Sequence, residues 1–291
     1  MKRVFAFAAC LLWMTPAAAQ IEVRDDRGVN VRLAQRATRI VSLAPHVTEM
    51  LFAVGAGAQV VAVSAHSDYP PEARGLPVVA GFADLDPERV LAFKPDLAVG
   101  WISGSRARAL ERIENAGVAT YLTEPKYTAD VERALAHLGL LTGREAQGRK
   151  AAQEFRARMD RLRAQYSTRP PVKVVVQLTV RPILSLSSRH FFSELLEICG
   201  GRNIAGDSAA AAPVLDPERV LASAPEVILY SSKDPVPDEA RRFWKRYPQI
   251  PAVRAGHLYG LDDDLVFRPG PRLAVGATQV CELLERARVQ P

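Results

Sequence analysis

The sequence predicts an α/β protein in which two lobes with mainly parallel sheets are joined by one long α-helix. Three observations predict this fold class. Short β-branched runs alternate with helix-like segments along most of the 291 residues. One long amphipathic segment interrupts the alternation, and a heptapeptide occurs once on each side of it. Alternating strands and helices are typical of parallel sheets covered by helices, and the repeat indicates two similar halves.

The composition excludes several classes of protein. Apolar residues make up 48%, charged residues 24%, and there are 3 Cys, which excludes a disordered, collagenous or disulfide-dense chain. The formal net charge is +6, but the 38 basic and 32 acidic residues are spread along the chain without a basic block. Because the distribution of charge matters more than its sum, we expect no nucleic-acid partner.

The N-terminus predicts a cleaved secretory signal, residues 1–19. Lys2 and Arg3 precede an apolar run, residues 4–14, which is too short to span a bilayer, and Ala17-Ala18-Ala19 follows. The alternative is an uncleaved anchor, but the small residues directly after the apolar run argue against it. Cleavage would lower the net charge from +6 to +4.

Cleavage would also remove Cys10 and leave Cys199 and Cys281. Two cysteines in an exported protein favour a disulfide, with two buried free thiols as the alternative.

The first lobe, residues 20–142, begins with a hairpin over residues 21–31. Strands are expected at residues 39–43, 60–63, 78–79, 97–100 and 120–122, and helices at residues 49–54, from 86 onward, 106–116 and 130–141. We expect Thr48 to cap the first helix, and Asp86 with Pro87 to start the second.

The connecting helix is expected within residues 143–168. Apolar side chains recur there at spacings of three and four, with charged residues between them. The apolar residues are Ala151, Phe155, Met159, Leu162 and Tyr166.

The second lobe, residues 169–291, resumes the alternation at residues 173–178, 191–199, 218–222 and 227–230 and ends in a helix over 271–288. A single stiff connection predicts small movements between the lobes.

The repeat is a seven-residue identity, Asp86–Ala92 and Asp216–Ala222, and a weaker echo pairs residues 48–51 with 193–196. It indicates that corresponding corners of the two lobes carry the same surface chemistry. Glu88 and Glu218 fall in first helical turns, where carboxylates are favourable and usually exposed.

No motif for catalysis or metal binding is present. The sequence lacks a phosphate-binding loop, a His-Glu-x-x-His pair and a Gly-x-Ser-x-Gly elbow, and none of its 5 His has a partner at metal-ligand spacing. We therefore assign no catalytic or metal-binding residue and expect neither enzyme activity nor a resident cofactor.

Aromatic and polar residues gather in loops at predicted strand ends, where open α/β sheets bind ligands. These loops contain Pro45-His46, residues 66–71, Gly81-Phe82, Trp101, residues 262–264 and residues 267–269. Such residues suit a large, partly apolar ligand held between the lobes. The alternative is that Phe82 and Trp101 are interdomain core.

At these residues the chain resembles a known family. Arg39–Pro45 with Thr48-Glu49, the Asp-Pro-Glu-Arg helices leading to Lys94–Leu97, and the long helix are similar to the periplasmic binding proteins of ABC importers for iron complexes and vitamin B12. This is the class III, helical-backbone group. The resemblance implies two Rossmann-like lobes, a periplasmic location, a monomer, and capture of a ligand for delivery to an ABC importer.

Within the class, Ser67–Pro71 and Leu195–Gly201 are most similar to the members that bind cobalamin. The resemblance implies that the ligand is cobalamin or a related corrinoid. Haem or a ferric siderophore would need the same cleft and is the alternative. A periplasmic enzyme acting on a metal chelate is a third, less favoured hypothesis.

Roles carried over from the resemblance complete the prediction. The ligand site is expected to contain Pro45, His46, Tyr69, Phe82, Trp101, Asp264 and Arg268. Phe82 stands in place of a tryptophan. Glu88 and Glu218 match acids that engage arginines of the permease, and Cys199 and Cys281 match a disulfide pair.

His46 replaces a small or polar residue. Its imidazole could reach the metal of the ligand, but we favour a residue that borders the cleft and hydrogen-bonds the backbone, because a metal-binding histidine needs a partner behind it.

Overall fold

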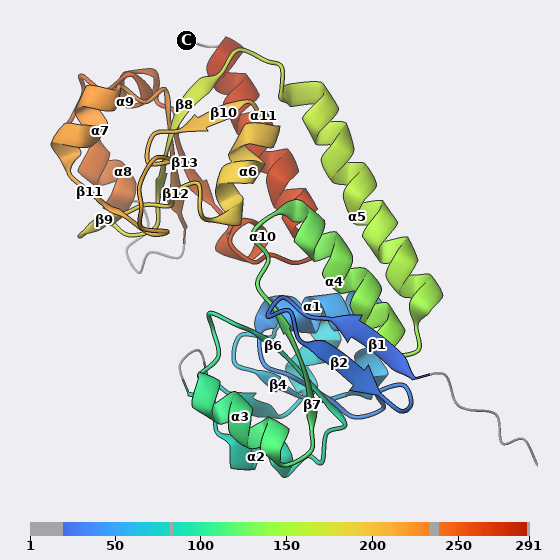
Figure 1. Ribbon diagram of the computed structural model, residues 1–291. Coiled ribbons are helices and arrows are strands. Elements are labelled where there is room, and N and C mark those ends of the chain that lie inside the picture. Colours follow the sequence, from blue (N-terminus) through green and yellow to red (C-terminus); the bar gives the residue numbers. More distant parts are fainter. Residues whose placement is uncertain (1–19, 82–83, 233–238, 290–291) are drawn as a thin grey trace, which may run out of the picture.

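The computed structural model describes residues 20–81, 84–232 and 239–289. The predicted signal segment, residues 1–19, lies outside this range, and so do Cys10 and Phe82. None of the helices in the described ranges is long and apolar enough to cross a membrane. Two α/β lobes are visible in Figure 1, with one long helix beside both, so the predicted fold class is confirmed.

The first lobe contains an antiparallel hairpin and a five-stranded parallel sheet with the order β5-β4-β3-β6-β7. The chain enters at the central strand β3, builds one side with β4 and β5, and returns to build the other with β6 and β7. The strands are β1 (Ile21–Arg24), β2 (Asn30–Leu33), β3 (Ile40–Ser42), β4 (Val60–Ser64), β5 (Val78–Ala80), β6 (Leu97–Trp101) and β7 (Ala119–Thr123). The helices are α1 (Pro45–Ala53), α2 (Pro87–Leu91), α3 (Ala107–Asn115) and α4 (Thr128–Leu141), with short 3₁₀ turns η1 (Gly57–Gln59) and η2 (Pro71–Gly75).

The second lobe contains a four-stranded parallel sheet with the order β10-β8-β12-β13 and a small antiparallel pair, β11 with β9. Its strands are β8 (Val172–Gln177), β9 (Ile183–Leu184), β10 (Gly201–Asn203), β11 (Val214–Leu215), β12 (Val227–Ser231) and β13 (Leu258–Leu261). Its helices are α6 (Phe191–Ile198), α7 (Pro217–Ser223), α8 (Glu239–Trp244), α9 (Pro251–Ala255), α10 (Asp263–Val266) and α11 (Leu273–Val289).

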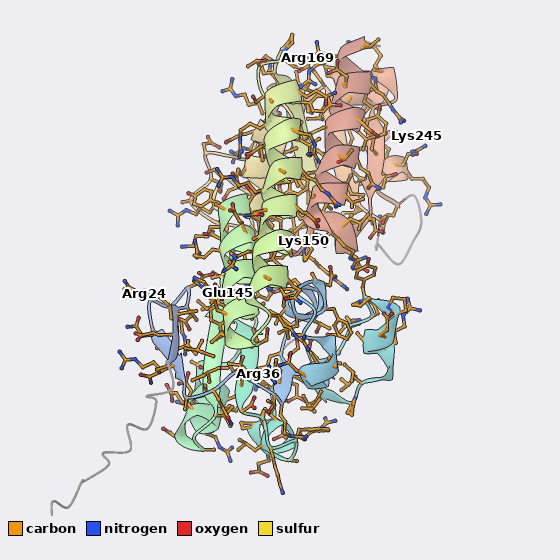
Figure 2. All side chains as sticks on the ribbon, turned by 90° about the vertical axis from the view of Figure 1, so that its right-hand side faces the viewer. Arg24, Arg36, Glu145, Lys150, Arg169 and Lys245 are labelled. Atoms are coloured by element: carbon orange, nitrogen blue, oxygen red, sulfur yellow. A yellow bond between two sulfur atoms is a disulfide. The ribbon has the colours of Figure 1, made fainter. Side chains whose placement is uncertain are left out.

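The connecting helix α5 (Glu145–Tyr166) runs from the first lobe to the second. In Figure 2 it rises from Glu145, beside the first lobe, toward Arg169, beside the second. Its buried stripe is Gly148, Ala152, Phe155, Met159, Leu162 and Tyr166. Ala151, which the spacing assigned to that stripe, is only partly buried. At the lower end α5 crosses α4 closely, since a Cβ at Gly139 would lie 2.7 Å from the Cα of Gly148.

The two copies of the heptapeptide fold alike, as α2 and α7, and each leads to a central strand, β6 or β12. The residues that follow match in backbone conformation, with φ of +48° at Lys94 and +46° at Ala224. The next acid is also equivalent. Asp96 accepts a hydrogen bond from the amide of Arg39, before β3, and Glu226 accepts one from the amide of Lys173, in β8.

The prediction that Thr48 caps the first helix was wrong. Helix α1 begins one turn earlier, with Pro45 at its first position and Ala44 before it, because the fixed φ of proline suits a first helical turn. The Thr48 hydroxyl instead bonds Ser42 Oγ at 2.7 Å and Ser67 Oγ at 2.9 Å. As a result His46 lies in the first turn of a helix rather than in a loop.

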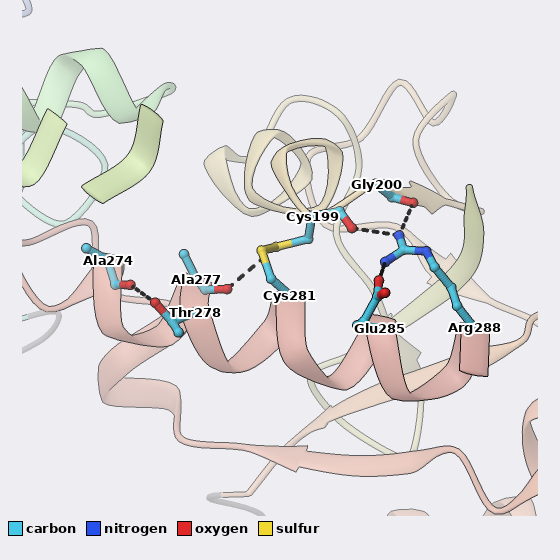
Figure 3. The surroundings of a disulfide bond; sticks show 8 residues. All are labelled: Cys199, Gly200, Ala274, Ala277, Thr278, Cys281, Glu285 and Arg288. Atoms are coloured by element: carbon cyan, nitrogen blue, oxygen red, sulfur yellow. Dashed lines mark hydrogen bonds and ion pairs between the residues drawn. A yellow bond between two sulfur atoms is a disulfide. The ribbon is translucent and has the colours of Figure 1, made fainter. Parts of the chain in front are cut away.

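Cys199 and Cys281 form a disulfide, as the sequence predicts, with 4.6 Å between their Cα atoms. Figure 3 shows that the bond joins the end of α6 to the middle of α11. Both sulfur-bearing residues are fully buried. The disulfide therefore fixes α6 against the C-terminal helix, with the start of α6 at the ligand cavity described below.

Candidate ligand-binding site

A cavity of about 430 Å³ lies between the two lobes, a volume within the usual range for small-molecule sites. The first lobe contributes Leu43, Ala44, Pro45, His46, Ser64, Ala65, His66, Gly81, Trp101 and Gly104, and the second contributes His190, Phe191, Phe267, Arg268 and Pro269. Most of these side chains are apolar or aromatic, and Arg268 is the one charged residue among those lining it in the described ranges.

The topology of the first sheet places the cavity. The order β5-β4-β3-β6-β7 reverses direction between β3 and β6, and ligands of open parallel sheets bind at the carboxyl ends of strands beside such a reversal. Pro45 and His46 follow β3, His66 follows β4, and Trp101 ends β6. A Cβ on Gly104 would overlap the ring of Trp101, so a glycine there lets the loop lie against the indole.

Four of the seven predicted ligand residues line this cavity: Pro45, His46, Trp101 and Arg268. Phe82 lies outside the described residues, although its neighbour Gly81 is part of the wall. Tyr69 and Asp264 are not part of the wall. Tyr69 is 44% exposed, with the guanidinium of Arg272 over its ring at 4.1 Å, and Asp264 forms an ion pair with Arg268 at 2.9 Å.

His46 is buried and holds a defined hydrogen bond. Only 4% of the residue is exposed, and its ring meets Trp101 edge to face, with 5.8 Å between centroids. Its Nε2 lies 3.4 Å from Thr123 Oγ1, so its partner is a side chain rather than the backbone that we expected. Burial, together with the positive charge of Arg268, lowers the pKa of His46 to about 3. The ring is therefore neutral at physiological pH.

His190 plays a different role at the opposite wall. It precedes α6, and its Nδ1 accepts a hydrogen bond from the amide of Phe192 at 3.2 Å. Burial lowers the pKa of His190 to about 4. A neutral imidazole that accepts at Nδ1 carries its proton on Nε2, so His190 presents the remaining nitrogen as a hydrogen-bond donor.

A cross-lobe ion network lies beside the cavity and is centred on Glu49 of α1. Both Glu49 oxygens accept from Arg272, at 2.9 and 2.6 Å, and one lies 3.5 Å from Arg268. Arg268 also contacts Asp68 at 3.3 Å, in addition to Asp264. Three carboxylates and two guanidinium groups thus meet here. Their charges sum to one negative charge, and the network joins the lobes.

The network changes the acidity of its members. The hydrogen bond with Glu49 is the largest influence on Arg272, and it raises the pKa of that guanidinium. Partial burial alone would raise the pKa of Asp68, but the hydrogen bond from Arg268 and its positive charge lower it below the ordinary value. Arg272 and Asp68 are therefore charged at neutral pH.

Glu88 and Glu218 lie far from this cavity, in the first turns of α2 and α7. Both side chains are exposed, and Glu88 forms an ion pair with Arg112 at 3.1 Å. Figure 1 shows α2 and α7 in different lobes, consistent with one acid at each of two corresponding corners.

Sequence reasoning missed several residues of this region: Glu49, His190, Phe191 and Arg272. Glu49 carried a usable signal. It interrupts the apolar run of α1 and is only 3% exposed, and a buried carboxylate requires a cationic partner. His190 and Phe191 gave no comparable signal, because only the packing of α6 brings them to the cavity.

Within the described ranges, no group of three or more histidine, cysteine or acidic side chains is arranged to hold a free metal ion.

Known proteins of similar sequence match this chain across both lobes. The vitamin B12-binding protein of Vibrio cholerae serotype O1 is 36% identical over 254 residues, which cover 87% of this chain and 91% of the relative. The vitamin B12-binding protein of Vibrio parahaemolyticus is 34% identical over 251 residues, covering 86% and 90%.

Solved structures of periplasmic binding proteins superpose on the same two-lobed fold. The periplasmic vitamin B12-binding protein of Vibrio cholerae superposes with a TM-score of 0.80 at 35% identity, covering 87% of this chain and 98% of that chain. A periplasmic heme-binding protein in complex with two hemes superposes with a TM-score of 0.78 at 22% identity, covering 87% and 99%. The second likeness concerns the fold alone.

The family model for periplasmic binding proteins matches residues 40–265, which include most of both lobes, the connecting helix and most of the cavity wall. The chain belongs to the periplasmic binding protein family.

Proposed function

We propose that this protein captures cobalamin or a related corrinoid between its lobes in the periplasm and delivers it, chemically unchanged, to an ABC importer. The observation that carries the proposal is the cavity between the lobes, lined by Trp101, Phe191 and Phe267 and bordered by Arg268. Relatives named vitamin B12-binding proteins match over about nine-tenths of their own length, at 34% and 36% identity. Flat aromatic side chains suit the face of a macrocycle.

The charge around Arg268 favours a corrinoid over haem. Its guanidinium is surrounded by Glu49, Asp68 and Asp264, so little positive charge is left for a ligand carboxylate. Haem carries two carboxylates, whereas the edge of a corrin carries uncharged amides. Since like charges at close range disfavour a ligand, the network disfavours haem and anionic ferric chelates.

The test is retention of ligand by the purified protein. The protein is incubated separately with cyanocobalamin, haemin and ferric siderophores and desalted, and the absorbance spectrum of the protein fraction is recorded. We expect unaltered cyanocobalamin in the protein fraction and little haemin. Retention of haemin with release of the corrinoid would contradict the proposal, and a chemically altered ligand would support an enzyme instead.

Delivery is proposed to use Glu88 and Glu218 as the two points of contact with arginines of the permease. Their exposure, their place in identical heptapeptides and the matching geometry of α2 and α7 support this role.

A further inference from the structure

His46 differs from the other cavity histidines in the nitrogen that it leaves available. Thr123 has one hydroxyl proton, which it donates to the carbonyl of Gly100 at 3.3 Å. The same hydroxyl oxygen must therefore accept the bond from His46, so the proton of the neutral ring is on Nε2. Nδ1 is left as an unprotonated nitrogen with a free lone pair.

The Nδ1 lone pair is open to the cavity. Among the described residues, the polar and ring contacts of the His46 side chain are those to Thr123 and Trp101, and neither engages Nδ1. Nδ1 has no hydrogen-bond partner among the described residues, yet it is not fully buried and keeps some accessible surface. Because the residue is 96% buried and lines the cavity, the surface that it keeps faces the ligand space.

These features match those of a metal-binding imidazole. Metal-ligating histidines are neutral and usually donate their other N–H to a second group, which fixes the tautomer and orients the ring. In this protein Thr123, itself anchored on Gly100, is that second group. Burial keeps the ring unprotonated over the physiological pH range.

We propose that His46 Nδ1 coordinates the metal of the bound ligand at an exchangeable axial position, with Thr123 as its positioning residue. The inference rests on the proposed function. For aquacobalamin, a bond forms between the Nδ1 lone pair and cobalt while the bond from cobalt to water breaks. The water leaves, and neither the proton on Nε2 nor the oxidation state of cobalt changes. The protein would thereby distinguish corrinoids with an open axial position from those whose position is blocked.

The experiment compares aquacobalamin with cyanocobalamin, whose cyanide occupies the axial position. Visible spectra and dissociation constants are measured for the full chain and for His46→Ala. We expect binding to shift the absorption bands of aquacobalamin in the unmodified protein but not those of cyanocobalamin. In His46→Ala the shift disappears, and the affinity for aquacobalamin falls at least about tenfold more than the affinity for cyanocobalamin.

Matched variants exclude the neighbouring histidines. His190 uses Nδ1 as an acceptor for the amide of Phe192, so His190→Asn should keep the shift, as should His66→Ala. Thr123→Val removes the partner of Nε2 and should weaken aquacobalamin binding by about tenfold without affecting cyanocobalamin. A far-ultraviolet circular dichroism spectrum that matches that of the unmodified protein shows that each variant is folded.

Two results would overturn the inference: aquacobalamin that binds the unmodified protein without a band shift, or a shift that persists in His46→Ala. Failure of the unmodified protein to bind cyanocobalamin would instead refute the proposed function. The two failures are therefore distinguishable.

Discussion

At the scale of single residues, the site depends on polar groups that are buried and paired. Glu49 is 3% exposed and forms two hydrogen bonds with Arg272 from the other lobe. His46 and His190 are neutral because burial lowers their pKa values to about 3 and about 4. We therefore expect substitution of these groups to change the free energy of unfolding in ways that substitution of an exposed residue of the same type does not.

Glu49→Gln should lower the free energy of unfolding by about 3 kcal/mol, because it leaves Arg272 partly buried without its counter-charge. The comparison is Glu145→Gln, whose pair with Arg149 is exposed and should contribute less than about 1 kcal/mol. Urea denaturation of both variants measures the difference. Equal effects would show that burial adds nothing to the Glu49 pair.

His46 and His190 predict acid sensitivity. Both have folded-state pKa values below the ordinary 6.5, so the unfolded chain takes up protons first as the pH falls. Their stabilising contribution is complete above pH 6.5 and is lost toward pH 3, at roughly 1.4 kcal/mol per pH unit for each histidine. Combining His46→Gln with His190→Asn should flatten the curve of unfolding free energy against pH in this window, whereas His66→Asn, at an exposed position, should leave it unchanged.

At the scale of elements, helix α6 links the cavity to the disulfide. Its first residues, Phe191 and Phe192, lie at or beside the ligand space, and Cys199 directly follows its last turn. Arg288 of α11 adds hydrogen bonds to the carbonyls of Cys199 and Gly200, as Figure 3 shows. The position of one cavity wall therefore depends on how α6 is held against α11.

Removal of the disulfide should destabilise the fold. The bond closes a loop with a sequence separation of 82, for which the chain-entropy model gives about 4 kcal/mol. Cys199→Ser combined with Cys281→Ser should lower the denaturation midpoint. A reducing agent should lower the midpoint of the unmodified protein but not that of the double variant, which has no disulfide to reduce. Identical midpoints with and without reductant in the unmodified protein would contradict the prediction.

Elements with a local signal could be predicted from the sequence. The 3.6-residue period identified α5, and Asp-Pro-Glu located α2 and α7. The start of α1 was misjudged because Thr48 resembles a cap, whereas its hydroxyl is used by Ser42 and Ser67. The cavity was predicted in outline from strand ends, but His190 lines it, and Arg272 reaches the network beside it, through packing between distant segments, which no local pattern encodes.

At the scale of the whole molecule, the lobes are held by more than the connecting helix. The network of Glu49 with Arg272 and Arg268 lies on one side of the interface. Glu194 of α6 accepts from the amide of Thr128, at the start of α4, at 2.6 Å, and from Arg163 of α5 at 3.1 Å. The lobes should therefore move little when ligand binds.

This restraint is measurable by small-angle scattering. The radius of gyration should change by less than about 1 Å between the ligand-free and the cobalamin-saturated protein, as in other preorganised complexes. A larger contraction would show that the contacts of Glu49 and Glu194 break and re-form during binding.

The proposed docking on a permease also belongs to this scale, since its two points of contact lie in different lobes. Glu88→Arg combined with Glu218→Arg should abolish cobalamin uptake by cells and leave the dissociation constant of the purified protein unchanged, because both residues are exposed and distant from the cavity. Reversing two exposed glutamates of α5, Glu145 and Glu154, is the control. Normal uptake by the first variant would refute the docking role.

The two interface glutamates have one further consequence. Glu49 and Glu194 occupy matching positions in the echo between residues 48–51 and 193–196, and each reaches from its own half of the chain to the opposite half. Reciprocal use of equivalent residues is the signature of an isologous dimer interface. The two lobes thus meet as the subunits of a homodimer do, with the cavity at the boundary between them and α5 as the tether that joins them.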